Sequence, residues 1–328
     1  RRSATQGMVL LKNENSALPL KNAKTIAAFG VHSYKLISGG TGSGEVNKAY
    51  VISLKEGLKN AGFSIDKSVE LIYEKYLSSE KEKQTAKHSF LMPDPIIPEM
   101  PVSGHAISSF VSADIAIITI GRVSGEFADR QIKNDYCLSK TEFELIDNVS
   151  EVFHTAGKKV VVILNVGGVI EVASWRDKVD AILLAWLPGQ EAGNAIADIL
   201  SAKVNPSGKL ATTFLKKYED EGSSAKFPGK EYGQEITLGL RKVRLAEIEY
   251  SEGIYVGYRA FDKQKINPAY EFGFGLSYTD FDYRNLVLSS PEFRGEMKVN
   301  ITIKNTGQIP GREIVQVYLS APGKTMDK

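Results

Sequence analysis

The chain has 328 residues, which is enough for two or three domains of ordinary size. Its 41 basic and 39 acidic residues leave a net charge of only +2, and without a long block of Lys or Arg the sequence predicts no nucleic-acid partner. The single cysteine, Cys137, excludes an internal disulfide and a cysteine-based metal site, and no apolar run has the length of a membrane-spanning helix.

The first segment, RRSATQGMVLLKNEN, has no initiator Met and places Ala4, Met8 and Leu11 on one apolar face at helical spacing. We therefore expect a helix there, and we expect the chain to be a fragment or a processed protein. Because targeting signals can be lost in that way, the compartment stays open between the cytoplasm and the periplasm or the cell exterior.

Short apolar runs alternate with helical patterns up to about residue 215. The expected strands cover residues 25–31, 114–121, 159–166 and 181–187, and the expected helices cover 50–62, 138–158 and 189–203. Ser139 and Glu142 form a predicted capping box, and Gly157 is the predicted end of that helix. Strands buried on both faces and separated by helices predict a mostly parallel sheet in a layered α/β sandwich domain over residues 1–215.

The stretch 78–104 interrupts this alternation, because it is polar at first and then holds four prolines. We expect an insertion or a long loop there.

Two segments follow the ends of expected strands, where ligands bind in sheets of this kind. The segment 38–46, SGGTGSGEV, is rich in glycine, which lets the backbone approach a ligand closely. It is either part of a site or a plain turn, and its spacing does not fit the dinucleotide-binding pattern G-x-G-x-x-G. The segment 121–130, GRVSGEFADR, holds Glu126, which is either a solvated loop residue or a carboxylate held for chemistry.

The chain changes character after residue 215. Residues 216–250 are polar without clear periodicity, and residues 252–262 and 268–283 are rich in aromatics and glycine. We therefore expect a linker or arm packed between domains over 216–277. Beyond it, Val299, Ile301 and Ile303 alternate as in a strand, and 312–322 reads as another strand. This pattern predicts the start of a fibronectin type III-like β-sandwich over 278–328, which is too short to be complete.

Several segments together resemble, in order, the C-terminal half of a family 3 glycoside hydrolase of the β-glucosidase type. They include GMVLLKNENSALPL, GGTGSG, SGEFADR, PGQEAG, NPSGKL and FGFGLSYT, and the last three in combination are specific. The resemblance covers nearly the whole chain. It implies a preceding β/α-barrel domain that carries the Asp nucleophile, so we expect this chain to be inactive by itself.

The resemblance also implies roles for single residues. Glu126 takes the role of general acid/base, as one of the two carboxylates that a retaining glycosidase needs. The loop of Thr41, Gly42 and Ser43 lines the glucose subsite, with Ser43 near a sugar hydroxyl. From the residue types, Arg122, Asp129 and Arg130 are expected to brace the Glu126 loop, the last two by pairing with each other or with nearby backbone.

The implied partners are a terminal β-glucoside as substrate and the barrel domain of the same enzyme. No cofactor is implied, and the four histidines share no spacing that predicts a metal site. Members of this family range from glucosidases to xylosidases, which leaves the sugar open. The alternative function is a non-catalytic carbohydrate-binding or interaction module that kept the fold without the barrel.

Overall fold

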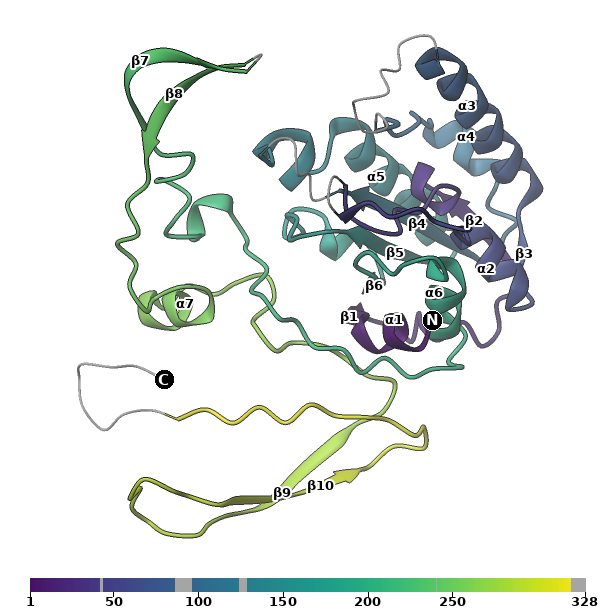
Figure 1. Cartoon of the computed structure of the whole chain (residues 1–328). Helices are drawn as coiled ribbons and strands as arrows, with labels where there is room; N and C mark the ends of the chain where they lie inside the picture. Colours follow the sequence, from purple (N-terminus) through teal and green to yellow (C-terminus); the bar gives the residue numbers. More distant parts are fainter. Residues whose placement is uncertain (42–43, 86–95, 124–128, 240, 320–328) are drawn as a thin grey trace.

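The core of the N-terminal α/β part is a six-stranded sheet in the order β1-β6-β5-β4-β2-β3 (Figure 1). A computed structural model describes residues 1–41, 44–85, 96–123, 129–239 and 241–319 of the chain. The sheet is parallel except for β1, which is antiparallel to β6. Its strands are β1 (Val9–Asn13), β2 (Thr25–Phe29), β3 (Ser64–Ile65), β4 (Ile115–Arg122), β5 (Lys159–Val166) and β6 (Ala181–Leu184). The mostly parallel α/β fold predicted from the sequence is confirmed.

Helices cover both faces of this sheet, so its strands carry apolar side chains on both sides. On one face Tyr73 and Leu145 pack in the same apolar cluster as Ile118 of β4. On the other face Leu54 packs in the same cluster as Ile117 of β4. The first face carries α3 (Lys67–Thr85), α4 (Gly104–Ser108) and α5 (Lys140–Thr155), and the second carries α1 (Arg2–Gly7), α2 (Leu54–Asn60) and α6 (Ala192–Leu200).

Short turns of other helix types connect these elements. Three-residue 3₁₀ helices cover Val31–Ser33, Arg176–Lys178 and Tyr218–Asp220, and a π-type turn covers Ile132–Tyr136.

The chain beyond residue 215 leaves the sheet and forms two separate hairpins (Figure 1). Bridges between Phe214 and Tyr270 and between Leu10 and Leu276 bring it back to the sheet between the hairpins. Its elements are β7 (Lys230–Leu238), β8 (Arg241–Glu247), α7 (Tyr258–Gln264), β9 (Phe281–Leu288) and β10 (Val299–Asn305).

Several local predictions are confirmed. The strand 159–166 has the predicted bounds, and Ser139 and Glu142 form a capping box in which each side chain binds the other residue's backbone N–H. Gly157 follows the same helix with a φ of +68°, the left-handed conformation that glycine adopts most easily.

The predicted helix at the start of the chain is partly wrong. The helix covers only Arg2–Gly7, and residues 9–13 form the strand β1. Val9 and Leu11 pack into the cluster on one face of the sheet, while Met8 and Leu10 pack into the cluster on the other. A strand buried on both faces has no polar alternation, so its apolar run also fits a helical pattern.

Four other expectations need correction. α2 begins at Leu54 rather than at residue 50, because Ser53 caps it. Helix α3 extends to Thr85 and so occupies the first part of the stretch expected to be a loop. The expected linker or arm, which has no clear periodicity over residues 216–250, contains the β7–β8 hairpin, whose β7 residues are exposed on both sides and therefore show no burial pattern. Residues 312–319 are extended but pair with no strand among the residues described here.

Candidate functional site

A cavity of about 790 Å³ lies beyond the carboxyl ends of β2 and β4. One wall is the glycine-rich segment from Ser38 to Thr41, and another is Gly121, Arg122 and Val123 at the end of β4. The two segments singled out in the sequence therefore meet at one place. Of the predicted site residues, Thr41 and Arg122 line this cavity, whereas Gly42, Ser43 and Glu126 lie outside the described residues.

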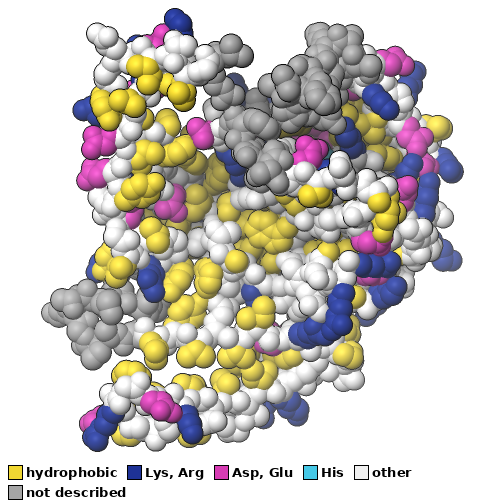
Figure 2. Space-filling view, viewed as in Figure 1, with side chains coloured by type: hydrophobic (Ala, Val, Ile, Leu, Met, Phe, Trp, Pro, Cys, Tyr) yellow, Lys and Arg dark blue, Asp and Glu magenta, His cyan; other side chains and the backbone are white. Residues whose placement is uncertain are grey.

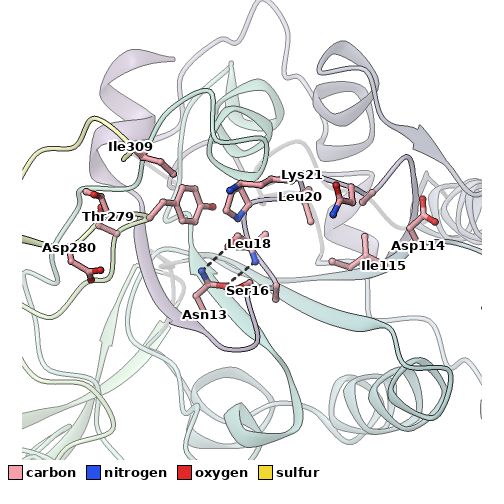
Figure 3. A pocket seen from close by; sticks show the side chains of 16 residues that line it. Asn13, Ser16, Leu18, Leu20, Lys21, Asp114, Ile115, Thr279, Asp280 and Ile309 are labelled. Atoms are coloured by element: carbon pink, nitrogen blue, oxygen red, sulfur yellow. Dashed lines mark hydrogen bonds between the residues drawn. The ribbon is translucent and has the colours of Figure 1, made fainter. Parts of the chain in front are cut away.

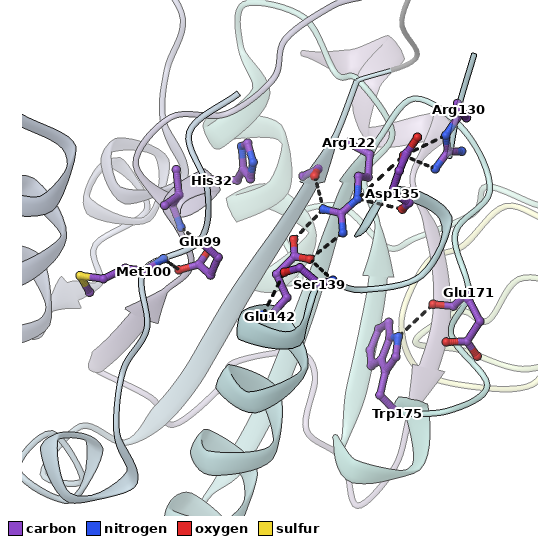
Figure 4. Close-up of polar contacts among 12 residues, drawn as sticks. His32, Glu99, Met100, Arg122, Arg130, Asp135, Ser139, Glu142, Glu171 and Trp175 are labelled. Atoms are coloured by element: carbon purple, nitrogen blue, oxygen red, sulfur yellow. Dashed lines mark hydrogen bonds and ion pairs between the residues drawn. The ribbon is translucent and has the colours of Figure 1, made fainter. Parts of the chain in front are cut away.

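Arg122 is buried at the end of β4 and forms a bidentate ion pair with Glu142 (Figure 4). Its Nη1 and Nη2 each donate to one Glu142 oxygen at 2.6 Å, and Nε donates to the Asp135 carbonyl at 2.9 Å. Burial alone raises the pKa of Glu142, but the Arg122 hydrogen bonds and charge hold it below its ordinary value. The pair therefore connects the start of α5 to the last residue of β4, four residues before Glu126 in the sequence.

Arg130, on the far side of that loop, binds the carboxylate of Asp135. Its Nε and Nη2 donate to Asp135 Oδ1 at 3.0 and 2.8 Å, and its Nη1 donates to the Val169 carbonyl at 2.7 Å. The expected contact with nearby backbone is thus present, but the acidic partner of Arg130 among the described residues is Asp135 rather than Asp129. Asp129 is exposed, and its carbonyl accepts a hydrogen bond from Gln131 Nε2.

Asp135 is therefore a shared anchor that the sequence analysis missed. Arg122 and Arg130, which flank residues 124–128, both bind it, one through the carbonyl and one through the carboxylate. Its second oxygen accepts the Gln131 N–H at 3.0 Å. The sequence gives no signal for the role of Asp135, because this residue lies in an irregular turn and not in a regular helix or strand. In that π-type turn, Ile132–Tyr136, Asn134 has a φ of +64°.

The glycine-rich segment has its own anchor in Asn165, which is buried near the end of β5. The side chain accepts the Ile37 N–H at 2.7 Å and donates to the Ile37 and Trp186 carbonyls at 2.9 and 2.8 Å. A polar residue inside the apolar run KVVVILNV is a sequence signal that identifies this position.

Glu99 and His32 also line the cavity. The Glu99 carboxylate accepts hydrogen bonds from the Val31 N–H, the Met100 N–H and the Tyr73 hydroxyl at 2.9–3.0 Å, yet its burial raises its pKa to about 7. Burial lowers the pKa of His32 to about 4, so that its imidazole is neutral at neutral pH. His32 therefore adds no charge to the wall, which holds the Arg122–Glu142 pair and also the ion pair of Lys48 with Glu45 at 3.8 Å.

A different cavity, of about 550 Å³, lies at the opposite end of the strands, where β4 begins (Figure 3). Asp114 and Ile115 line it where β4 begins, and Thr279 and Asp280 line it from the C-terminal part of the chain. Asn13 fixes the neighbouring turn by hydrogen bonds to the N–H and the carbonyl of Leu18, each at 2.9 Å. The cavity therefore lies at the amino ends of the parallel strands, whereas α/β sheets bind ligands at the carboxyl ends.

No helix among the described residues has both the length and the apolar character needed to cross a membrane. No group of three or more His, Cys, Asp or Glu side chains in that part of the chain is arranged to hold a metal ion.

Among curated proteins, β-glucosidase A of Butyrivibrio fibrisolvens is 34% identical over 373 aligned residues, which cover 99% of this chain and 42% of that protein. Thermostable β-glucosidase B of Acetivibrio thermocellus is 34% identical, with 97% of this chain and 38% of that protein covered. The chain therefore spans about two fifths of the length of these relatives.

Solved structures agree over the same region. β-Glucosidase 3B from Thermotoga neapolitana, in complex with glycerol, is 44% identical with a TM-score of 0.89, covering 100% of this chain and 44% of that one. A β-glucosidase from Paenibacillus barengoltzii is 30% identical with a TM-score of 0.78, covering 93% of this chain and 32% of that one. The model of the glycosyl hydrolase family 3 C-terminal domain matches residues 8–278, and the chain therefore belongs to glycoside hydrolase family 3.

Proposed function

We propose that the chain is part of a retaining β-glucosidase, in which Glu126 acts as general acid/base and Thr41, Gly42 and Ser43 line the glucose subsite. The observation that carries this proposal is that Thr41 and Arg122 line the same cavity. Thr41 directly precedes Gly42 and Ser43 in the sequence, and Arg122 lies four residues before Glu126. The names of the relatives support the substrate class, and the Thermotoga neapolitana enzyme has also been solved in complex with glucose.

The chemistry needs a second carboxylate, which we assign to an Asp on a β/α-barrel domain outside this chain. In the first step that carboxylate forms a bond to the anomeric carbon while the bond to the leaving oxygen breaks. The electron pair of the broken bond goes to that oxygen, which takes the proton of Glu126. In the second step Glu126 takes a proton from water, and the water oxygen displaces the nucleophile.

Ion pairs and hydrogen bonds hold the described residues on either side of Glu126 in the sequence. Arg122 and Arg130 flank residues 124–128, and both bind Asp135. Arg122 is held in turn by Glu142 at the start of α5. A general acid has to stay within hydrogen-bond reach of its oxygen, and anchors on both sides of a loop reduce the freedom that otherwise weakens proton transfer.

We also propose a division of the chain that fits this role. Residues 1–215 form the α/β sandwich that carries the acid/base, and residues 216–277 pack between domains. Residues 278–328 begin a fibronectin type III-like domain.

The substitution Glu126→Ala in the full-length enzyme tests the proposal. It should slow glycosides with poor leaving groups by about 10²–10⁴-fold, because only these need protonation at departure. Activated aryl glucosides should form the glycosyl-enzyme and then stall. Added azide needs no base and should restore turnover with a β-glycosyl azide as product.

Glu151→Ala is the matched control, since Glu151 is an exposed glutamate on α5 that does not line the cavity. It should leave both substrate types within about twofold of the wild type, as surface substitutions usually do. Equal losses on both substrate types in Glu126→Ala, with no response to azide, would refute the assignment.

A further inference from the structure

A carboxylate joins two walls of the cavity that lies beyond the carboxyl ends of β2 and β4. Residues 96–99 form one of these walls, and residues 31–41 contribute much of the other. Glu99 belongs to the first wall, and its Oε2 accepts the N–H of Val31, where the second wall begins, at 2.9 Å. The function proposed above assigns no role to this contact.

The other carboxylate oxygen of Glu99 holds the first wall against α3. Oε1 accepts the Tyr73 hydroxyl and the Met100 N–H, each at 3.0 Å (Figure 4). Tyr73 is fully buried, and the Tyr76 hydroxyl of the same helix donates to the Pro98 carbonyl at 3.1 Å. Three donors therefore meet at one carboxyl group, and an ionised carboxylate, which only accepts hydrogen bonds, is the form that satisfies all of them.

The second wall leads from this contact to the predicted glucose subsite. The turn Val31–Ser33 is followed by Ile37, whose backbone binds the Asn165 side chain, and then by residues 38–41, which line the cavity. The wall is thus held at its start by Glu99 and further on by Asn165. Loss of the first contact gives the glycine-rich segment more freedom to shift relative to the sheet.

We propose that Glu99 is a positioning residue of the glucose subsite, and that its ionised form holds the two cavity walls in the geometry that binds the sugar. The inference rests on the proposed function, because it concerns the subsite assigned there.

Protonation of Glu99 weakens this arrangement. A proton on Oε2 points at the Val31 N–H, so that two donors face each other. A proton on Oε1 has an acceptor if the Tyr73 hydroxyl turns, but the Met100 N–H then loses its charged acceptor. The second form is the less costly one, and it loosens the wall of residues 96–99.

The groups around Glu99 determine the pH at which this change occurs. Burial raises the pKa of Glu99 to about 7, its hydrogen bonds oppose that rise, and the charge of Glu142 on α5 adds to it. Burial also raises the pKa of Tyr73 on α3, which therefore stays a neutral donor. Arg122 on β4 is paired with Glu142, and His32 is uncharged at neutral pH. Glu99 is partly exposed to the cavity, so protons can reach it.

The test measures the affinity of the full-length enzyme for glucose by calorimetry between about pH 5.5 and pH 8.5, on either side of this titration. Glu99→Gln cannot ionise, and Tyr73→Phe removes the hydroxyl donor but keeps the ring. Glu144→Gln is the control, because Glu144 is an exposed glutamate on α5 that does not line the cavity. Each Kd is divided by the wild-type Kd at the same pH, which cancels the titration of carboxylates that all the proteins share.

We expect the Kd ratio of Glu99→Gln to be about tenfold at the alkaline end and to fall within about twofold at the acidic end, where the wild type is itself protonated. Tyr73→Phe removes a hydrogen bond to the ionised form, which raises the pKa of Glu99 further. Its loss of affinity on acidification should therefore begin at a higher pH than in the wild type. The ratio of the control should stay near one throughout.

A Kd ratio for Glu99→Gln that is the same at every pH would overturn the inference, because a residue that only supports the fold does not make sugar binding follow its own titration. A ratio near one at the alkaline end would do so as well. If Glu99→Gln does not fold, an unshifted pH profile of Tyr73→Phe is sufficient to reject it. Glucose binding needs no turnover, so a failure of the Glu126 experiment removes the proposed catalytic role without affecting this measurement.

Discussion

Arg122 and Glu142 are both charged and both buried. The stability of the fold therefore depends on each charge being balanced by the other. Arg122→Met should lower the free energy of unfolding by about 3–5 kcal/mol, because it leaves a buried carboxylate without a partner. The double variant Arg122→Met with Glu142→Leu removes both charges and should recover much of that loss. Urea denaturation of the four members of the cycle measures the coupling.

Arg130→Met is the control for that cycle, since the ion pair of Arg130 with Asp135 is partly exposed to solvent. It should cost about 1 kcal/mol or less. A double variant as unstable as Arg122→Met alone would show that the pair is not coupled in the way its geometry indicates.

These same residues show how far the sequence can predict a site. Ser139 and Glu142 were identifiable as a capping box because helix capping is a local pattern. Glu142 also binds Arg122, and this contact depends on how α5 packs beside β4. The spacing of the two residues in the sequence does not predict it. Contacts of this kind are set by tertiary packing, which local sequence does not encode.

At the scale of elements, the strands and helices of the sheet were predictable where local signals agree. Strand β5 contains the apolar run Val160–Leu164, which is rich in β-branched residues, and glycine follows the strand, so its predicted bounds are correct. Strand β1 also begins with an apolar run, Val9–Leu11, but the spacing there predicts a helix, because burial on both faces removes the period of two. Its pairing with β6 is a long-range contact that only the folded sheet reveals.

Helices α2 and α6 approach closely through two glycines, and this contact can be tested. A Cβ atom on Gly193 would lie 1.8 Å from the Ser53 carbonyl oxygen, and one on Gly57 would lie 2.1 Å from the Gly193 carbonyl. Gly193→Ala should therefore force the helices apart and cost about 1–3 kcal/mol, as overpacking of a core does. The thermal midpoint and the urea midpoint should both fall.

Gly7→Ala is the matched control for that substitution. Gly7 also lies in a helix, but a Cβ atom there would have no neighbour within 4 Å. Its stability should stay the same or rise slightly, because alanine favours helix more than glycine does. Similar losses of stability in Gly193→Ala and Gly7→Ala would mean that the close approach of α2 and α6 does not restrict the size of the side chain at position 193.

At the scale of the whole molecule, the C-terminal part exposes many large apolar side chains. Figure 2 shows hydrophobic side chains along the arm that carries β7 and β8, where Tyr232, Ile236, Leu238 and Leu245 are all exposed. Ordinary monomeric surfaces contain few apolar patches of this extent. The distribution agrees with the proposal that this chain functions as one part of a larger enzyme.

That proposal predicts the behaviour of the 328-residue chain alone. It should release no measurable nitrophenol from nitrophenyl β-glucoside, because the nucleophile assigned above is not on it. The full-length enzyme, assayed at the same molar concentration, is the positive control. Turnover by the chain alone that is abolished by replacing one of its own Asp residues would place the nucleophile within it.

The position of β1 has a consequence for how the protein is made. Asn13 of β1 pairs with Ala181, so about 170 residues separate the two ends of this pairing. At about 5–20 residues per second, β1 leaves the ribosome roughly 10–35 s before β6 is available. During that time strand β1, which begins with the apolar residues Val9, Leu10 and Leu11, has unpaired backbone on both sides, a condition that promotes aggregation of nascent chains. We therefore expect the folding of this sheet during synthesis to be helped by a chaperone that covers β1 until β6 emerges.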